Sequence, residues 1–318
     1  MGGRALRGRS AESDRRPGAA RESAAAGHLV RPDGAMERSM TRLRWLDAGE
    51  GPAVVLLHAF PCDHRMWHAQ VPTLVEAGWR VLVPDLPGFG DSALPDKQPE
   101  TQPESLPEAG PSLGAVVDLI VADLLELGVD RLIVGGLSVG GYLVMEWLRK
   151  DPQMLAGIAL CDTKATADAP AAKRGRLEMA AAVESDPTVT AALLRERVLP
   201  VIVGATTNAQ RPEVVVLVAG WMDAAAPQTI AWYQRAMAAR PDSLATLAEC
   251  EIPALVLWGE QDSMSDRNEQ QLMLDALRDA RFTTIAGAGH LSAIENPADV
   301  GSELLAFAQA VRRSTLDG

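Results

Sequence analysis

Six residues decide the fold of this chain: Gly135-Gly136-Leu137-Ser138-Val139-Gly140. They follow the apolar run Leu132-Ile133-Val134, which predicts a buried strand, and they precede a helical pattern over residues 142–150. Strand, Gly-x-Ser-x-Gly and helix together are typical of a nucleophile elbow. The glycines permit a cramped turn that pushes one hydroxyl out above the sheet. Ser138 is therefore the candidate nucleophile.

A serine nucleophile needs a base, and the order of residues along the chain limits the choice. After such an elbow the acid comes next in the chain, and the histidine comes last. The sequence has five histidines, and only His290 follows Ser138. It lies in Gly287-Ala288-Gly289-His290-Leu291, after the strand pattern of residues 281–285. We predict that a loop at this strand end brings the His290 imidazole onto the serine.

An acid is expected between these two residues. The continuous apolar run of residues 253–258 predicts a strand buried on both faces, and Asp262 lies on the loop that follows it. A carboxylate there can fix the tautomer of His290 and stabilise the imidazolium that forms. Glu260 on the same loop and Asp162 after an earlier strand pattern are alternatives for this role. A further alternative is that Asp262 only caps the next helix.

Two backbone N–H groups are predicted to form the oxyanion hole, because negative charge develops on the carbonyl oxygen of an ester under attack. One belongs to Val139, directly after the nucleophile at the start of a helix. The other belongs to Phe60, in the loop after the strand pattern of residues 54–57.

The chain resembles the α/β-hydrolase superfamily over about residues 41–312. Five motifs in family-like order carry the resemblance: residues 57–61 (LHAFP), 84–92 (PDLPGFGDS), 136–141 (GLSVGG), 259–262 (GEQD) and 287–290 (GAGH). The resemblance implies an α/β-hydrolase fold with a helical cap inserted after the sixth strand. Within the superfamily, the chain is similar to capped serine hydrolases of the enol-lactonase, esterase and cofactor-free haloperoxidase group.

Two positions depart from the family pattern. Ala59 stands where members usually carry glycine, so the oxyanion loop is expected to be slightly shifted, since alanine has less backbone freedom. Ser138 stands where haloalkane dehalogenases and epoxide hydrolases carry aspartate, so these two activities are not expected.

The alternation of predicted strands and helices indicates a mostly parallel central sheet flanked by helices on both faces. We assign this core to residues 39–163 and 245–318. Residues 1–38, rich in Ala, Gly and Arg, are expected to be a disordered extension. Residues 93–112, with proline at every fourth position, predict an extended acidic loop. The Ala-rich, helical residues 164–244 are expected to form the cap.

The cap contains large side chains that could shape a substrate pocket. We expect Trp221, Trp232 and Tyr233 to contribute to an apolar pocket above the serine. A cap of this kind excludes water from the reaction.

The composition of the chain limits the kinds of partner and cellular location that are expected. The 318 residues are 47% hydrophobic, which is enough for a large core. No stretch of the sequence approaches 18 consecutive apolar residues, so a membrane-spanning helix is not expected. The net charge of −12 argues against nucleic acid, whose backbone would repel it. Three widely spaced cysteines indicate a reducing compartment, and we expect a cytoplasmic protein without cofactor or metal. His64 and His68 have metal-ligand spacing, but we expect surface residues because only Asp63 could accompany them.

These expectations converge on a serine hydrolase that cleaves a carboxylic ester or lactone of a small to medium apolar substrate through an acyl-enzyme. A carbon–carbon bond hydrolase and a cofactor-free haloperoxidase of the same fold are alternatives, and so is a non-enzymatic ligand-binding protein. The expected partner is a small molecule, and a homo-oligomer is compatible with the sequence.

Overall fold

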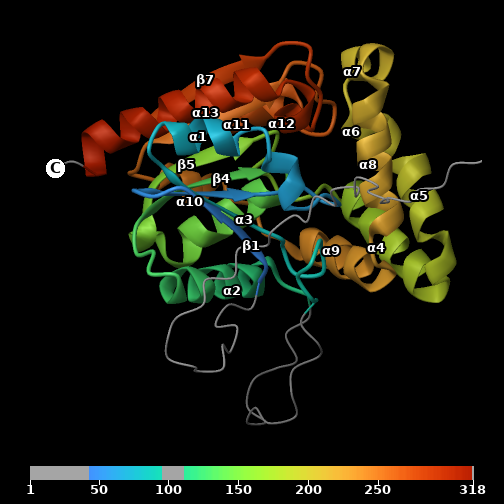
Figure 1. Cartoon of the computed structure of the whole chain (residues 1–318). Helices are drawn as coiled ribbons and strands as arrows, with labels where there is room; N and C mark the ends of the chain where they lie inside the picture. Colours follow the sequence, from blue (N-terminus) through green and yellow to red (C-terminus); the bar gives the residue numbers. More distant parts are fainter. Residues whose placement is uncertain (1–42, 95–110, 317–318) are drawn as a thin grey trace, which may run out of the picture. The chain divides into compact units, whose positions relative to one another are not determined.

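A computed structural model describes residues 43–94 and 111–316, which belong to one unit spanning residues 39–318. The predicted N-terminal extension and most of the predicted proline-rich loop lie outside the described residues. The described strands form one seven-stranded sheet in the order β1-β3-β2-β4-β5-β6-β7 (Figure 1). Their bounds are β1 (Trp45–Ala48), β2 (Ala53–Leu57), β3 (Arg80–Pro84), β4 (Leu132–Leu137), β5 (Leu155–Cys161), β6 (Ala254–Gly259) and β7 (Ala280–Ile285).

The sheet is parallel except at one edge, where β1 runs antiparallel to β3. Every residue of β2, β4 and β5 is buried, which explains their continuous apolar sequences. Because the remaining strands are parallel, their carboxyl ends meet at one edge of the sheet, where ligands bind in open α/β sheets.

Helices cover both faces of this sheet, as predicted. α1 and α13 pack against each other on one face, and α3 packs with α2 and α10 on the other, where α11 also packs against α10 (Figure 1). The core helices are α1 (Val71–Glu76), α2 (Leu113–Glu126), α3 (Val139–Lys150), α10 (Leu244–Ala248), α11 (Arg267–Ala276), α12 (Ser292–Glu295) and α13 (Pro297–Val311). Short 3-10 turns lie at η1 (His64–Trp67) and η2 (Pro152–Met154), and a π turn, η4 (Arg312–Leu316), ends the described chain.

Between β5 and the core helix α10, which precedes β6, six helices form the cap. They are α4 (Pro170–Ser185), α5 (Thr190–Arg197), α6 (Leu199–Ile202), α7 (Ala205–Gln210), α8 (Pro212–Ala224) and α9 (Pro227–Ala239), with a 3-10 turn, η3 (Pro187–Val189), before α5. They lie within the residues predicted for the cap. The insertion follows β5, the fifth strand of the described residues. Pro170, Pro212 and Pro227 each begin a helix, since proline lacks only an N–H that a helix start leaves unpaired.

Proline also divides one segment that the sequence pattern predicts as a single helix. The expected helix over residues 66–77 is a 3-10 turn, η1, followed by α1, which has Pro72 in its first turn. The expected helix over residues 188–199 is found as η3 and α5, which end at Val189 and Arg197, and α6 begins after it with Pro200 in its first turn. A proline inside a helix would remove a hydrogen bond and clash with the preceding turn.

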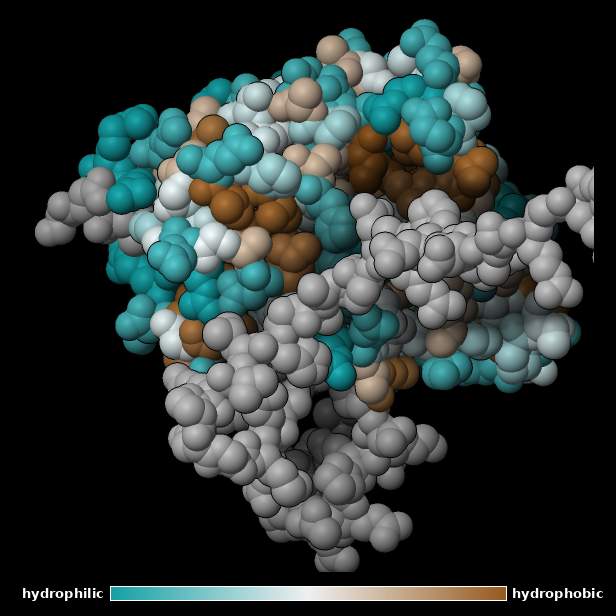
Figure 2. Space-filling model, in the orientation of Figure 1, coloured by the Kyte–Doolittle hydropathy of each residue, from teal (hydrophilic) through white to brown (hydrophobic). Residues whose placement is uncertain are grey.

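On the face shown in Figure 2, hydrophilic residues cover much of the surface and hydrophobic residues gather in separate patches. Val216 and Leu217 of α8 are among the large apolar side chains that remain exposed. Within residues 43–94 and 111–316, no single helix is long and apolar enough to cross a membrane. α8 and α9 meet the length and composition criteria only as a pair, which is bent by 99°.

Candidate active site

The turn between β4 and α3 holds Ser138 in a strained conformation. Its φ of 56° and ψ of −113° lie in a region that side-chain-bearing residues rarely adopt. The turn is possible because the flanking residues lack side chains. A Cβ on Gly136 would lie 2.2 Å from the Gly140 backbone, and a Cβ on Gly140 would lie 2.3 Å from the Leu57 carbonyl oxygen. The N–H of Ser138 donates to the Cys161 carbonyl at 3.0 Å, which ties the turn to the end of β5.

The loop after β7 brings His290 to this serine. The imidazole Nε2 lies 2.8 Å from Ser138 Oγ, and Nδ1 lies 2.9 Å from Asp262 Oδ2. An ionised carboxylate can only accept, so Nδ1 carries the proton and donates it to Asp262. Nε2 is then free to take the proton of the serine hydroxyl. The three residues predicted from sequence are therefore in hydrogen-bond contact, in the order that nucleophilic catalysis requires.

Asp262 is itself fixed by its own loop. Its carboxylate accepts from the N–H groups of Met264 at 2.8 Å and Ser265 at 3.2 Å, and from the Ser265 hydroxyl. Burial acts to raise its pKa, but the charge of His290 and these hydrogen bonds together lower it below the ordinary value. The next helix, α11, is capped by Asp266 instead, whose carboxylate accepts from the N–H groups of Asn268 and Glu269, the second and third residues of the helix. Helix capping is thus not the role of Asp262.

The pKa of His290 is raised above its ordinary value. Burial alone acts to lower it, because a buried imidazolium loses its hydration. The Asp262 carboxylate outweighs this effect through its charge and its hydrogen bond, with smaller contributions from Asp162 and Glu295. The site therefore favours the protonated imidazole, which is the species formed when serine transfers its proton.

The two alternative acids form hydrogen bonds with groups other than His290. Glu260 is exposed and accepts from the Gly287 N–H at 3.1 Å. Asp162 is buried at the end of β5, with a φ of 44°, and accepts from the Gly259 N–H at 2.6 Å and from the hydroxyl and N–H of Ser292. Burial, and next the charge of Asp262, raise the pKa of Asp162 well above its usual range. It joins the ends of β5 and β6 to α12, and it has no hydrogen bond to His290.

The two predicted oxyanion donors come from neighbouring strands. Phe60 follows β2 and Val139 follows β4, and these strands pair in parallel, so their carboxyl ends lie side by side. Neither N–H donates to any group of the described residues. Phe60 lines one cavity together with Ser138 and His290. Two unpaired N–H groups at these strand ends can donate hydrogen bonds to an oxyanion and stabilise its charge.

The loop that carries Phe60 accommodates alanine without strain. Ala59 is buried, and its φ is not among the positive values, so glycine is not required there. His58 holds the loop in place: its Nδ1 donates to the Ala59 carbonyl at 2.9 Å, and its Nε2 accepts from the Leu86 N–H at 2.9 Å. Burial lowers the pKa of His58 from 6.5 to about 4, so this imidazole is neutral at physiological pH.

A family model described as alpha/beta hydrolase fold matches residues 52–297. This chain belongs to the alpha/beta hydrolase family. A thermophilic esterase from Thermogutta terrifontis, solved with malate bound, is 33% identical with a TM-score of 0.77, and the match covers 85% of this chain and 93% of that one. An enol-lactonase from Burkholderia xenovorans is 24% identical with a TM-score of 0.73, covering 84% and 96% of the two chains, and this likeness shows the fold alone.

Curated relatives match over shorter stretches. Bifunctional epoxide hydrolase 2 of Sus scrofa is 34% identical over 122 residues, which is 38% of this chain. The match spans only 20% of the length of that relative, and the same share of its Rattus norvegicus counterpart.

The reactive groups of this alpha/beta hydrolase open into a cavity of about 280 Å³ beneath the cap. One end is formed by Phe60, Ser138 and His290. Apolar side chains of the cap and of the loop after β6 form much of its wall: Met179, Val198, Met237 and Met264.

The cavity differs from the predicted pocket, because none of the three predicted cap residues lines it. Trp221 is buried, with Arg65 6.0 Å from its ring centroid. Tyr233 packs its ring 4.9 Å from Phe89 and 6.5 Å from Phe60, and Trp232 packs on Tyr233. These side chains attach the cap to the core, whereas Gln234 and Met237, which lie about one turn apart on α9, line the cavity.

Glu295 is a site residue that the sequence reasoning missed. Its buried carboxylate accepts from the N–H groups of Gly289 and Leu291, on either side of His290, each at 3.0 Å. It also accepts from the N–H of Gly204 in the cap at 2.8 Å. One carboxylate therefore fixes the histidine loop and joins it to the cap. In the sequence, Glu295 is marked only by its position five residues after His290, and an acid at such a distance is too common to indicate a site residue.

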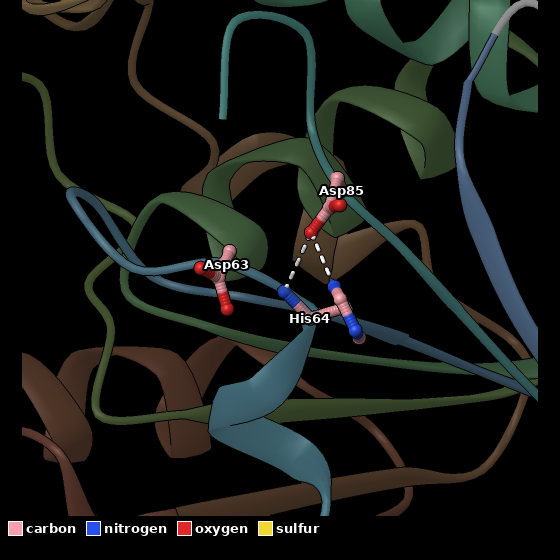
Figure 3. Close-up of side chains that lie close together, drawn as sticks. All are labelled: Asp63, His64 and Asp85. Carbon is pink, nitrogen blue, oxygen red and sulfur yellow. Dashed lines mark hydrogen bonds and ion pairs between the residues drawn. The ribbon is translucent and has the colours of Figure 1, made fainter. Parts of the chain in front are cut away.

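His64 was expected to be a surface residue, but it lies in a cluster with two aspartates. Figure 3 shows Asp63, His64 and Asp85, whose ligand atoms all lie within 4.8 Å of one another. His64 is half-buried, and its Nδ1 and N–H each contact Asp85 Oδ1, at 2.7 and 2.9 Å. Both Asp63 oxygens accept from Arg65, and Asp85 Oδ2 accepts from the Asp91 N–H. Protein donors thus already engage both carboxylates, and the cluster joins η1 to the loop after β3.

Proposed function

We propose that this chain is a serine hydrolase that cleaves a carboxylic ester or lactone through an acyl-enzyme. The observation that carries the proposal is the hydrogen-bonded sequence Ser138 Oγ, His290 and Asp262, with distances of 2.8 and 2.9 Å. The two unpaired N–H groups beside it support the same chemistry.

The proposed reaction has two steps. His290 Nε2 takes the hydroxyl proton of Ser138 as Oγ attacks the carbonyl carbon, and the N–H groups of Phe60 and Val139 bind the oxyanion. The carbonyl re-forms as the C–O bond to the alcohol breaks, and His290 gives its proton to the departing alkoxide. Water, activated by His290, then attacks the acyl-enzyme and releases the acid. Asp262 keeps the imidazole in the required tautomer throughout.

The identity of the nucleophile favours acyl substrates over epoxides and haloalkanes. A carboxylate that displaces at a saturated carbon forms an ester, which water can later cleave. A serine hydroxyl that did the same would form an ether, which has no carbonyl for water to attack. Ser138 therefore supports an ester or lactone substrate, although epoxide hydrolases are among the relatives.

A proton-release assay across esters and lactones of graded size tests the proposal. Wild type should acidify a weakly buffered solution with at least one substrate, and Ser138→Ala or His290→Ala should lower kcat by about 10⁴ or more. Residual activity within tenfold of wild type in either variant would refute the assignment. A fluorophosphonate probe gives an independent readout, because it should label wild type and leave Ser138→Ala unlabelled.

The cytoplasmic location stays a prediction. All three cysteines are buried and unpaired, as a reducing compartment would leave them.

A further inference from the structure

Three cationic side chains converge on one buried carboxylate at the wall of the catalytic cavity. Arg176 Nε donates to Asp168 Oδ2 at 2.6 Å, and Arg240 lies 3.0 Å from Asp168 Oδ1. Lys164 Nζ lies 3.5 Å from the same Oδ1. The Asp168 side chain is 1% exposed, so its charge is compensated almost wholly by these neighbours.

The cluster has more positive charge than its own structure needs. One carboxylate balances one cation, and three cations surround Asp168. Arg176 donates to its Oδ2, whereas Arg240 and Lys164 form ion pairs with Oδ1, which accepts no hydrogen bond among the described residues. Arg240 has further partners, since it donates to the Thr166 and Met237 carbonyls and stacks 4.1 Å from the Tyr142 ring centroid. Lys164 has no hydrogen bond among the described residues, and its ammonium has three donors. A half-buried ammonium with one long contact favours a further anionic partner.

These charges face the same cavity as the nucleophile. Lys164, Asp168 and Arg176 line it together with Ser138 and His290, and Asp168 is the one acidic side chain among the described lining residues. The rest of the lining is largely apolar. The cavity thus offers a nucleophile, an apolar wall and a cationic wall within about 280 Å³, which suits a small substrate.

We propose that the substrate of this enzyme carries a carboxylate, which Lys164 and Arg176 bind while Ser138 attacks the ester or lactone carbonyl. The inference rests on the proposed function and narrows its substrate to small anionic esters or lactones. Charge-assisted hydrogen bonds to a carboxylate are about twice as strong as neutral ones and are strengthened in a site shielded from water. The cationic wall therefore selects the substrate and orients its carbonyl.

Matched substrates test this selection. The monomethyl esters of succinate, glutarate and adipate are compared with esters in which a carboxamide of nearly the same shape replaces the free carboxylate. Acetoxyacetate and acetoxyacetamide test a carboxylate on the alcohol side. Wild type should prefer at least one carboxylate over its amide by about 10- to 100-fold in kcat/KM, as expected for a charge-assisted contact.

Lys164→Met removes the charge and keeps the length of the side chain, and it should reduce this preference about tenfold or more. Lys173→Met is the matched control, because Lys173 is an exposed lysine of α4 outside the cavity lining. It should leave the preference unchanged. Equal turnover of carboxylate and amide by wild type would overturn the inference and leave the serine hydrolase standing.

Binding to Ser138→Ala separates the two proposals if no ester is hydrolysed. Calorimetric titration with the same monomethyl esters and amides measures recognition without turnover. Selective binding of a carboxylate that Lys164→Met abolishes in the Ser138→Ala background would support the anion site, even if the proposed hydrolysis had failed. Absence of selective binding would overturn the anion site.

Discussion

Two aspartates at neighbouring strand ends have opposite electrostatic environments. Asp262 has a lowered pKa and holds His290, whereas Asp162 has a pKa well above its usual range and bonds only to Gly259 and Ser292. Asp262→Asn should lower kcat by about 10³–10⁴, because an amide can donate to Nδ1 and favour the wrong tautomer. Asp162→Asn should cost less than tenfold, since an amide resembles a protonated carboxyl and asparagine tolerates a positive φ. A larger loss for Asp162→Asn than for Asp262→Asn would exchange their roles.

The pH profile gives a second residue-level prediction. His290 must be neutral to act as a base, and Asp262 raises its pKa, so the acidic limb of kcat/KM should lie above pH 6.5 in wild type. Without the carboxylate, burial remains as the main influence and lowers the pKa. The limb of Asp262→Asn should therefore move to lower pH while the plateau falls. An unchanged limb would mean that another group controls the pH dependence. Asp262→Glu, which keeps a carboxylate, should move the limb part of the way back toward its wild-type position.

Motifs with fixed spacing made Ser138 and His290 predictable. Gly-x-Ser-x-Gly needs a particular turn, and His290 was the one histidine left after it. Asp262 followed from its place after a strand. The charged cluster at the cavity wall has no sequence motif that would reveal it. Folding of the cap, and not sequence spacing, brings together Lys164, Asp168, Arg176 and Arg240. The same limit explains why Trp232 and Tyr233 could be assigned to the cap but not divided between packing and pocket.

At the scale of elements, apolar runs predicted the parallel strands well, because strands buried on both faces must be apolar throughout. The break inside the predicted segment 66–77 was missed. There, Pro72 fits the first turn of α1 and stops the preceding turn from continuing as one helix.

The short helix α12 should couple the histidine loop to the cap through Glu295. Glu295→Gln keeps the shape but turns a donor group toward at least one of the three N–H groups that the carboxylate now satisfies. Leaving a buried donor unpaired costs about 1–3 kcal/mol. We expect the free energy of unfolding to fall by about 2 kcal/mol, and kcat to fall because His290 is less firmly placed.

Urea unfolding and ester kinetics check this prediction. Glu260→Gln is the control, since Glu260 is exposed and bonds to Gly287 of the same loop. Its effect should stay within about 0.5 kcal/mol, as for most surface substitutions. Equal effects of the two substitutions would show that Glu295 does not join loop and cap.

The stability of the whole molecule should depend on pH through His58. This imidazole joins the loop after β2 to the loop after β3, and burial lowers its pKa to about 4. The unfolded chain has the ordinary value of 6.5, so it binds a proton that the folded state does not bind between these two pH values. Stability is thus retained above pH 6.5 and falls as the pH drops toward 4. The loss from this group should reach about 2 kcal/mol at pH 5 and about 3 kcal/mol below pH 4.

Urea unfolding at pH 7.5, 6 and 5 isolates the contribution of His58. The raised pKa of His290 acts in the opposite direction, since the folded state then binds its proton more readily than the unfolded chain. The comparison must therefore be made between variants and not on wild type alone. His58→Gln should be less stable than wild type at pH 7.5, because the contacts to Ala59 and Leu86 are weakened, but it should lose about 2 kcal/mol less on acidification to pH 5. His68→Gln, at an exposed histidine, should alter the pH dependence far less. If His58→Gln and wild type lose the same free energy of unfolding between pH 7.5 and 5, protonation of His58 does not cause the pH dependence of stability.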